Sequence, residues 1–244
     1  PGGQYSALAV PANGWMNMLA DTLSETLQHL ENAAKAAHRP TPALLAVSKL
    51  QPASAAAELA RAGQRAFGEN YVQEAQAKIG ELAGMDLEWH LIGHLQSNKA
   101  ELAAHLFDWV QTVDRHKLIG ALSRYRPADR APLNVLVQVN IDDEASKHGC
   151  RPDEVADLAE AIAAEPRLRL RGLMAIPAPH PDTARRIDAF RRMQALQDQL
   201  AAKHPGVDTL SMGMSDDYAL AAAHGATMVR IGTALFGARP ARTA

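Results

Sequence analysis

The feature that most constrains this chain is a regular alternation of short apolar runs with amphipathic segments. The runs are too short for helices and are bounded by Pro, Gly or polar residues, which is typical of buried strands in a parallel sheet. Eight strands are predicted: 43–47, 65–68, 87–92, 108–113, 133–140, 168–176, 208–212 and 227–231. Since helical patterns separate them, the chain is predicted to be an α/β protein, a single (β/α)8 barrel, with a doubly wound open sheet as the alternative.

The segment before the first strand predicts an additional helix over about residues 16–38. Four leucines fall on one face of this helix: Leu19, Leu23, Leu27 and Leu30. Residues 1–15 are rich in Gly, Pro and small side chains, and we expect them to form a flexible leader or a cloning remnant. The remainder, 16–244, is expected to be one barrel domain, because no linker, repeat or low-complexity tract interrupts it.

Composition and charge exclude several classes of partner and site. Acidic side chains number 27 and basic ones 25, so a net charge of −2 gives no general attraction to nucleic acid or to a membrane, and neither is expected as a partner. The only cysteine, Cys150, excludes an internal disulfide and fits a reducing compartment. There is no run of about 18 apolar residues and no signal peptide pattern, so we expect a cytoplasmic protein. His90 and His94 lack a third ligand, and no metal site is expected.

A lysine stands where a parallel barrel carries its chemistry. Active sites of such barrels lie at the C-terminal ends of the strands, and Lys49 follows the first predicted strand almost directly. Desolvation at an apolar barrel mouth favours the uncharged form of an amine, which is a nucleophile for a carbonyl. Position alone also allows a solvated lysine at the end of a strand.

The last two predicted strands end in glycine-containing turns, 211–215 (SMGMS) and 230–233 (RIGT). Barrels of this class often bind phosphate in the loops after strands seven and eight. Glycine lets backbone N–H groups approach a phosphate, and Ser and Thr add donors. Each turn alone could be an ordinary glycine turn, but together they predict a phosphate site facing Lys49. A phosphorylated aldehyde such as pyridoxal phosphate (PLP) would satisfy both features.

Six blocks of the sequence resemble the pyridoxal phosphate homeostasis protein family, which is related to the barrel domain of alanine racemase. The blocks are 46–49 (AVSK), 67–74 (FGENYVQE), 89–99 (WHLIGHLQSNK), 172–174 (GLM), 211–217 (SMGMSDD) and 230–233 (RIGT). The resemblance implies a PLP-binding barrel that acts in intracellular PLP homeostasis. Such a carrier would supply PLP-dependent apoenzymes in transient encounters and would limit the free aldehyde.

The resemblance also implies roles for individual residues. Lys49 would hold the cofactor as an imine, and Arg230 would face the pyridine nitrogen and keep it unprotonated, because a fixed cation disfavours a second positive charge. The residues implied for the phosphate and its surroundings are Ser211, Gly213, Gly232 and Thr233, with Asn70 nearby.

Two positions depart from the family pattern. Gln51 stands where members often carry another lysine, so a transfer route through that amine is not expected. Cys150 stands where an aromatic or aliphatic residue is expected. Lys147 remains either a second amine for incoming cofactor or a solvated loop residue.

Two catalytic functions stay open beside the non-catalytic carrier. One is a PLP-dependent racemase or lyase with weak activity, and the other is an aldolase-like barrel whose lysine attacks its substrate directly. Racemisation needs acid/base groups on both faces of the carbanion, and alanine racemases take one from a separate C-terminal domain and a partner subunit. Only residues 238–244 follow the last predicted barrel element, so we expect the carrier and a monomer.

Overall fold

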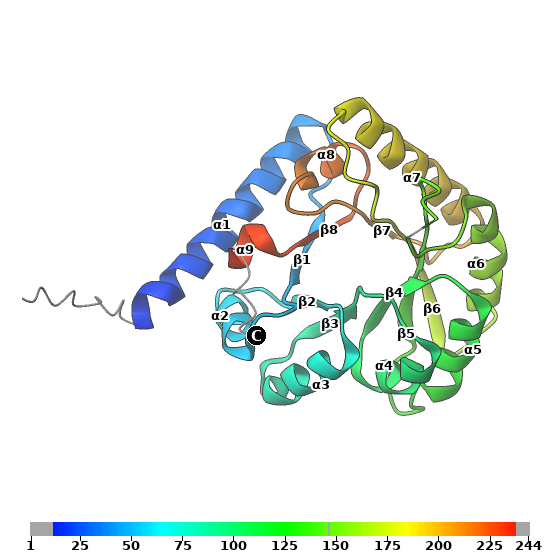
Figure 1. Cartoon of the computed structure of the whole chain (residues 1–244), viewed down its shortest axis with the longest axis horizontal. Helices are drawn as coiled ribbons and strands as arrows, with labels where there is room; N and C mark the ends of the chain where they lie inside the picture. The colour runs from blue at the N-terminus through cyan, green and yellow to red at the C-terminus, as the bar shows by residue number, and fades with distance from the viewer. Residues whose placement is uncertain (1–11, 146, 238–244) are drawn as a thin grey trace, which may run out of the picture.

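The strands close into a parallel barrel in the order β1 to β8 (Figure 1). In the computed structural model, residues 12–145 and 147–237 are described, with side chains from residue 18 onward. The strands are β1 (Ala43–Val47), β2 (Ala66–Glu69), β3 (Glu88–Leu91), β4 (Trp109–Val113), β5 (Leu133–Gln138), β6 (Leu168–Met174), β7 (Thr209–Ser211) and β8 (Met228–Ile231). All the predicted strands are present, most of them a residue or two shorter.

Helices follow the strands and surround the barrel. They are α1 (Ala12–Ala36), α2 (Ala53–Arg61), α3 (Val72–Glu81), α4 (Ala100–Leu106), α5 (His116–Tyr125), α6 (Val155–Ala163), α7 (Thr183–Lys203), α8 (Tyr218–Ala223) and α9 (Thr233–Phe236), with short 3-10 turns at Ala83–Met85, Ser97–Lys99 and Pro152–Glu154. The last strand pairs in parallel with the first, from Ala43 opposite Met228 to Ala46 opposite Ile231. This closure confirms the barrel and excludes the open sheet. Within the described residues, none of the helices combines the length and apolarity that a membrane crossing requires.

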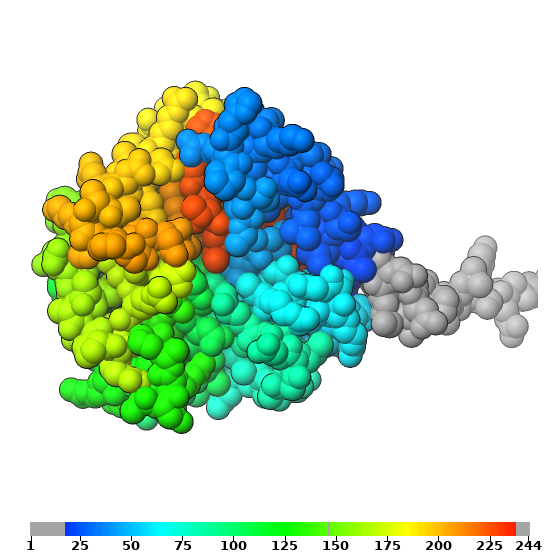
Figure 2. Space-filling view, turned by 180° about the vertical axis from the view of Figure 1, so that it is seen from behind, coloured from blue at the N-terminus to red at the C-terminus, as the bar shows by residue number. Residues whose placement is uncertain are grey.

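The additional helix α1 packs against both the first and the last of the helices that surround the barrel. It contacts α2, α8 and α9, and Figure 2 shows this blue helix from behind, beside the cyan and the orange-red segments. Leu30 is fully buried, whereas Leu27 is 42% exposed, so the prediction for Leu27 is wrong. The buried stripe runs instead through Thr26, whose hydroxyl donates to the carbonyl of Thr22 within the helix.

The start of α1 differs from the prediction. The helix begins at Ala12 and ends at Ala36, where the sequence predicts 16 and 38. Residues 1–11 of the predicted leader and residues 238–244 of the predicted barrel domain lie outside the described residues.

Alternate strand residues divide the core into two layers. Residues such as Leu44, Ala46 and Val229 belong to the large cluster between strands and helices. Two small separate clusters fill the interior of the barrel, one around Leu45, Ile92 and Met228 and one of Trp109, Leu136 and Met174. Polar side chains lie between these interior clusters, and they reach the C-terminal end where the site is formed.

Candidate functional site

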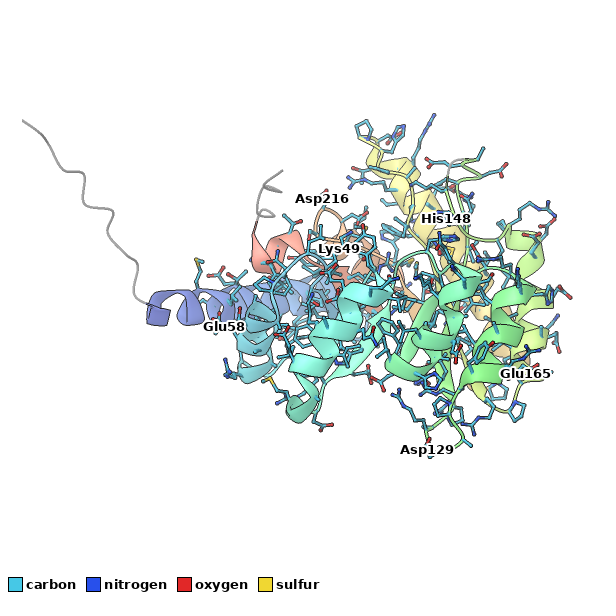
Figure 3. The ribbon with its side chains drawn as sticks, turned by 60° about the horizontal axis from the view of Figure 1, so that its bottom comes forward. Lys49, Glu58, Asp129, His148, Glu165 and Asp216 are labelled. Carbon is cyan, nitrogen blue, oxygen red and sulfur yellow. The ribbon has the colours of Figure 1, made fainter. Side chains whose placement is uncertain are left out.

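A pocket of about 460 Å³ opens at the C-terminal ends of the strands. Residues that follow β1, β2, β3, β6, β7 and β8 contribute to its walls, most of them from the turns after β1, β7 and β8. The lining residues are Val47, Lys49, Gln51, Asn70, Ile92, Ile176, Met214, Ser215, Asp216, Arg230, Gly232, Thr233, Ala234 and Gly237. Because β1 and β8 are neighbours, the turn with Lys49 lies beside the turn with Gly232. Figure 3 shows Lys49, His148 and Asp216 at one end of the barrel and Asp129 and Glu165 at the other.

The backbone on both sides of Lys49 is fixed by side chains of β2 and α3. The Ser48 hydroxyl donates to Glu69 Oε1 at 2.6 Å. Lys78 Nζ donates to the Ser48 carbonyl and to Glu69 Oε1, each at 2.6 Å. The Leu50 N–H donates to Glu74 Oε1 at 2.6 Å. Residues 48 and 50 are therefore held by charged groups, and the half-buried Lys49 side chain starts from a fixed point.

Leu50 adopts a conformation that needs such support. Its φ is +60°, in the left-handed region, which costs a non-glycine residue about 1–2 kcal/mol. The bond to Glu74, which is itself 3.3 Å from Lys78 Nζ, holds the turn in this conformation. We define Ser48, Glu69, Glu74 and Lys78 as the lysine-turn network.

The network contains a buried ion pair. The side chains of Lys78 and Glu69 are 5% and 0% exposed. Burial raises the pKa of Glu69, and the charge and hydrogen bond of Lys78 together with the Ser48 hydroxyl counteract that rise. A carboxylate in this position depends on its partner cation, since an unpaired buried charge is strongly unfavourable.

Arg230 brings the second positive charge to the pocket. It is 3% exposed, and burial lowers the pKa of its guanidinium to about 10, so it remains charged at neutral pH. Its Nη1 donates to Ser211 Oγ at 2.7 Å and its Nη2 to the Ala175 carbonyl at 2.9 Å. One hydrogen bond to β7 and one to the residue directly after β6 therefore determine its orientation.

The structure separates the predicted phosphate residues into two groups. Gly232 and Thr233 line the pocket, as do Lys49, Asn70 and Arg230. Ser211 does not: it is fully buried inside the barrel, where its hydroxyl donates to Gln111 Oε1 and accepts from Arg230. The strand carries the Ser211 side chain into the interior before the turn begins, and its role as a phosphate ligand stays a prediction.

Gly213 shapes the turn without lining the pocket. Its φ is +97°, and a Cβ there would lie 2.6 Å from the Cβ of Ala221 on α8. Ser215, two residues further along the same motif, does line the pocket and accepts a hydrogen bond from the Ala234 N–H at 3.2 Å. Ser215 belongs to the motif that the sequence identifies, but no site role is predicted for it there. The bond joins the two glycine-containing turns into one wall.

A Cβ on Gly232 would approach the Val47 carbonyl oxygen to 3.2 Å, so glycine lets the turn after β8 lie close against β1. One feature of the wall suits a bound molecule. Asn70 Oδ1 is buried and, within the described residues, has no hydrogen-bond partner. Buried acceptors are normally satisfied, and this unpaired one marks a position where a ligand can donate.

A second pocket of about 280 Å³ shares Asn70, Ile92 and Ile176 with the first. The rings of His94 and His148 stack there at 3.7 Å, and burial together with the neighbouring His148 lowers the pKa of His94.

Lys147 also lines this second pocket, with its Nζ 3.2 Å from Glu144 Oε2. Cys150 is buried, and burial raises its thiol pKa to about 12. Among residues 12–145 and 147–237 no group of three His, Cys, Asp or Glu side chains is arranged to hold a metal ion.

Comparison with known proteins defines the class. The family model described as the alanine racemase N-terminal domain matches residues 22–240, so the chain belongs to that family. Alanine racemase from Corynebacterium glutamicum has the same fold, with a TM-score of 0.67 at 20% identity over 94% of this chain and 63% of that one.

Relatives with more than half of their aligned residues identical share one name within this class. The pyridoxal phosphate homeostasis protein of Escherichia coli K12 is 52% identical over 229 residues, 92% of this chain and 98% of the relative. That of Haemophilus influenzae is 54% identical over 218 residues, 87% of this chain and 92% of the relative.

PipY of Synechococcus elongatus, solved without PLP, matches with a TM-score of 0.81 at 38% identity over 90% of this chain and 100% of PipY. The structure of PipY with PLP bound matches with a TM-score of 0.77 at 36% identity, and it also covers 90% of this chain and 100% of PipY.

The lysine-turn network generates a stability test. We expect Lys78→Met to lower the free energy of unfolding by about 3–5 kcal/mol, because it leaves Glu69 buried without its cation. Adding Glu69→Gln should recover most of that loss, since the double variant no longer buries a charge. The measurement is urea denaturation at neutral pH, with Lys35→Met on the exposed side of α1 as the control. Equal stability of wild type and Lys78→Met would contradict the network.

Proposed function

We propose that this protein binds PLP in the pocket at the barrel mouth and acts in its intracellular homeostasis, holding it as an imine on Lys49. The single observation that carries the proposal is one pocket lined by both a lysine amine and the two glycine-containing turns. The names of the E. coli and H. influenzae relatives and the PLP-bound PipY structure support it.

The residues present fit the chemical groups of PLP. Lys49 offers an amine for the aldehyde. Ser215, Thr233 and the backbone at Gly232 offer hydroxyl and amide donors for the phosphate. Arg230 suits the pyridine nitrogen, because the fixed guanidinium keeps that nitrogen unprotonated. When bound, PLP supplies an electron sink, and an unprotonated ring makes that sink weaker.

The finer part of the proposal is a carrier that supplies PLP-dependent apoenzymes and limits the free aldehyde. A racemase needs an acid/base group on each face of the reacting carbon. Apart from Lys49, the titratable side chains on the described wall of the pocket are Arg230 and Asp216. Arg230 is committed to two hydrogen bonds and Asp216 is exposed at the rim. This lining supports holding a cofactor rather than transferring protons.

We further propose that the protein works in the cytoplasm as a monomer and meets apoenzymes transiently. The buried, unactivated thiol of Cys150 requires no oxidising compartment. The pocket that would release the cofactor opens on the rim formed by the turns after the strands.

Reduction with borohydride tests the attachment. Incubation with PLP should give a yellow protein, and reduction followed by peptide mass mapping should place the cofactor on Lys49, the amine in the pocket. We expect Lys49→Ala to lose the visible band, while Lys147→Ala, whose amine lies in the neighbouring pocket, should keep it. Loading of Lys49→Ala at the wild-type rate would contradict the attachment, and a colourless wild type would contradict it and favour the aldolase alternative.

Solvent exchange of amino-acid α-protons tests the carrier against the racemase. We expect the PLP-loaded protein to exchange these protons no faster than free PLP at equal concentration, because the other titratable groups of the described wall are Arg230, held by two hydrogen bonds, and Asp216, exposed at the rim. The measurement is NMR of L-alanine in deuterated buffer, with an authentic alanine racemase as the positive control. Rapid exchange that disappears in Lys49→Ala would overturn the carrier.

A further inference from the structure

A row of polar side chains crosses the interior of the barrel from its mouth to its opposite end. It runs from Arg230 on β8 through Ser211 on β7 and Gln111 on β4 to His90 on β3. These four side chains are at most 3% exposed. Barrel interiors are usually filled by branched apolar residues, and here the row separates the two small apolar clusters.

The hydrogen bonds along the row all have the same direction. A guanidinium only donates, so Ser211 accepts from Arg230 and turns its own proton to Gln111 Oε1 at 2.7 Å. The Gln111 amide nitrogen therefore points away from Ser211 and lies 2.9 Å from His90 Nδ1, which accepts. The proton of His90 is then on Nε2, 2.7 Å from Glu88 Oε1. Because Arg230 can only donate, this order of donors and acceptors assigns the proton of neutral His90 to Nε2, where it faces Glu88.

The far end of the row is anchored. His90 stacks on Trp109 with ring centroids 4.9 Å apart, and Trp109 in turn lies under the guanidinium of Arg171 at 4.5 Å. The charged groups that act on His90 are Glu88 on its own strand, Asp108 and Arg171. The Glu88 side chain is 48% exposed and ends the row in solvent.

Such a row stabilises a fold only when every member is paired, since an unsatisfied buried polar group costs more than an apolar residue in its place. Other polar atoms of the row also have partners outside it. Gln111 Nε2 also contacts Met228 Sδ at 3.2 Å, and Arg230 Nη2 donates to the Ala175 carbonyl. The row reaches solvent at Glu88 and the ligand pocket at Arg230. The row therefore acts on the ligand pocket through Arg230.

We propose that Gln111 and His90, anchored by Glu88, are positioning residues that hold the Arg230 guanidinium in its orientation toward the pocket. The inference rests on the proposed function for the identity of the ligand, but the positioning itself belongs to the protein without ligand. It is tested first there, by NMR of the guanidinium groups and imidazoles in ¹⁵N-labelled protein.

The unmodified protein gives the first test. His90 should be neutral at pH 6.5, with its proton on Nε2, because a proton on Nδ1 would face the Gln111 amide group. The ¹⁵N shifts of the two ring nitrogens report this directly. A proton on Nδ1, or a charged His90 at that pH, would overturn the proposal without any variant.

Two substitutions break the row at successive places. Gln111→Met removes the bond that orients Ser211, and His90→Phe keeps the stack on Trp109 but removes the acceptor for Gln111. We expect the guanidinium rotation of Arg230 to become several-fold faster in Gln111→Met, with a smaller effect in His90→Phe. Gln64→Met is the matched control, because Gln64 is also buried and donates two hydrogen bonds, to the carbonyls of Leu44 and Ala66, neither of which bonds to a residue of the row.

Binding of PLP gives the second readout. Loss of one positioning hydrogen bond should weaken PLP binding by about five- to tenfold in Gln111→Met, with wild-type affinity in Gln64→Met. Unchanged Arg230 rotation in both row variants would overturn the positioning role. Faster rotation in a protein that does not bind PLP would leave the positioning role intact and contradict the proposed function instead. If Gln111→Met does not fold, His90→Phe and the tautomer of the unmodified protein decide the question.

Discussion

The parallel pairing of β1 with β8 is the constraint on which the site depends. It joins segments that lie almost at opposite ends of the chain, with Ala46 opposite Ile231. The turn after β1 carries an amine, and the turn after β8 carries a glycine that lets it lie close to Val47. Neither turn forms a pocket by itself. The helix α1 supports the same closure from outside, since it packs against α2, α8 and α9.

The second constraint is the burial of charge beside this closure. Two cations, Lys78 and Arg230, lie almost fully inside the protein. Lys78 is paired with the carboxylate of Glu69, whereas the hydrogen bonds of Arg230 go to neutral oxygens of Ser211 and Ala175. A buried guanidinium that forms no ion pair among the described residues is well suited to face a ligand acceptor. The lysine-turn network thus fixes the amine side of the pocket, and the polar row fixes the guanidinium side.

The sequence predicts the fold well because both periodicities are local. The apolar runs identify all the strands, and the position of Lys49 directly after one of them places the amine at the barrel mouth. The sequence does not decide where the Ser211 side chain points, because this residue belongs to both the predicted strand and the predicted turn; in the structure it ends β7 with its side chain inside the barrel. The prediction for Leu27 fails, since the inward face of α1 includes a threonine.

The polar row could not be predicted from the sequence. Gln111 and His90 look like ordinary polar residues within apolar strands, and the bond between Ser211 and Gln111 joins residues separated by 100 positions. The lysine-turn network is equally non-local, because Lys78 lies 30 positions from the Ser48 carbonyl that it holds. Only the closed barrel brings such residues together, whereas the amine and the glycine-containing turns are recognisable as separate motifs.

The most direct test of the central claim is a crystal structure of the protein grown with PLP. The account requires continuous density from Lys49 Nζ to the aldehyde carbon, the phosphate beside Gly232 and Thr233, and the pyridine nitrogen facing Arg230. Density attached to Lys147 or another lysine, or a phosphate bound away from the turns after β7 and β8, would contradict it.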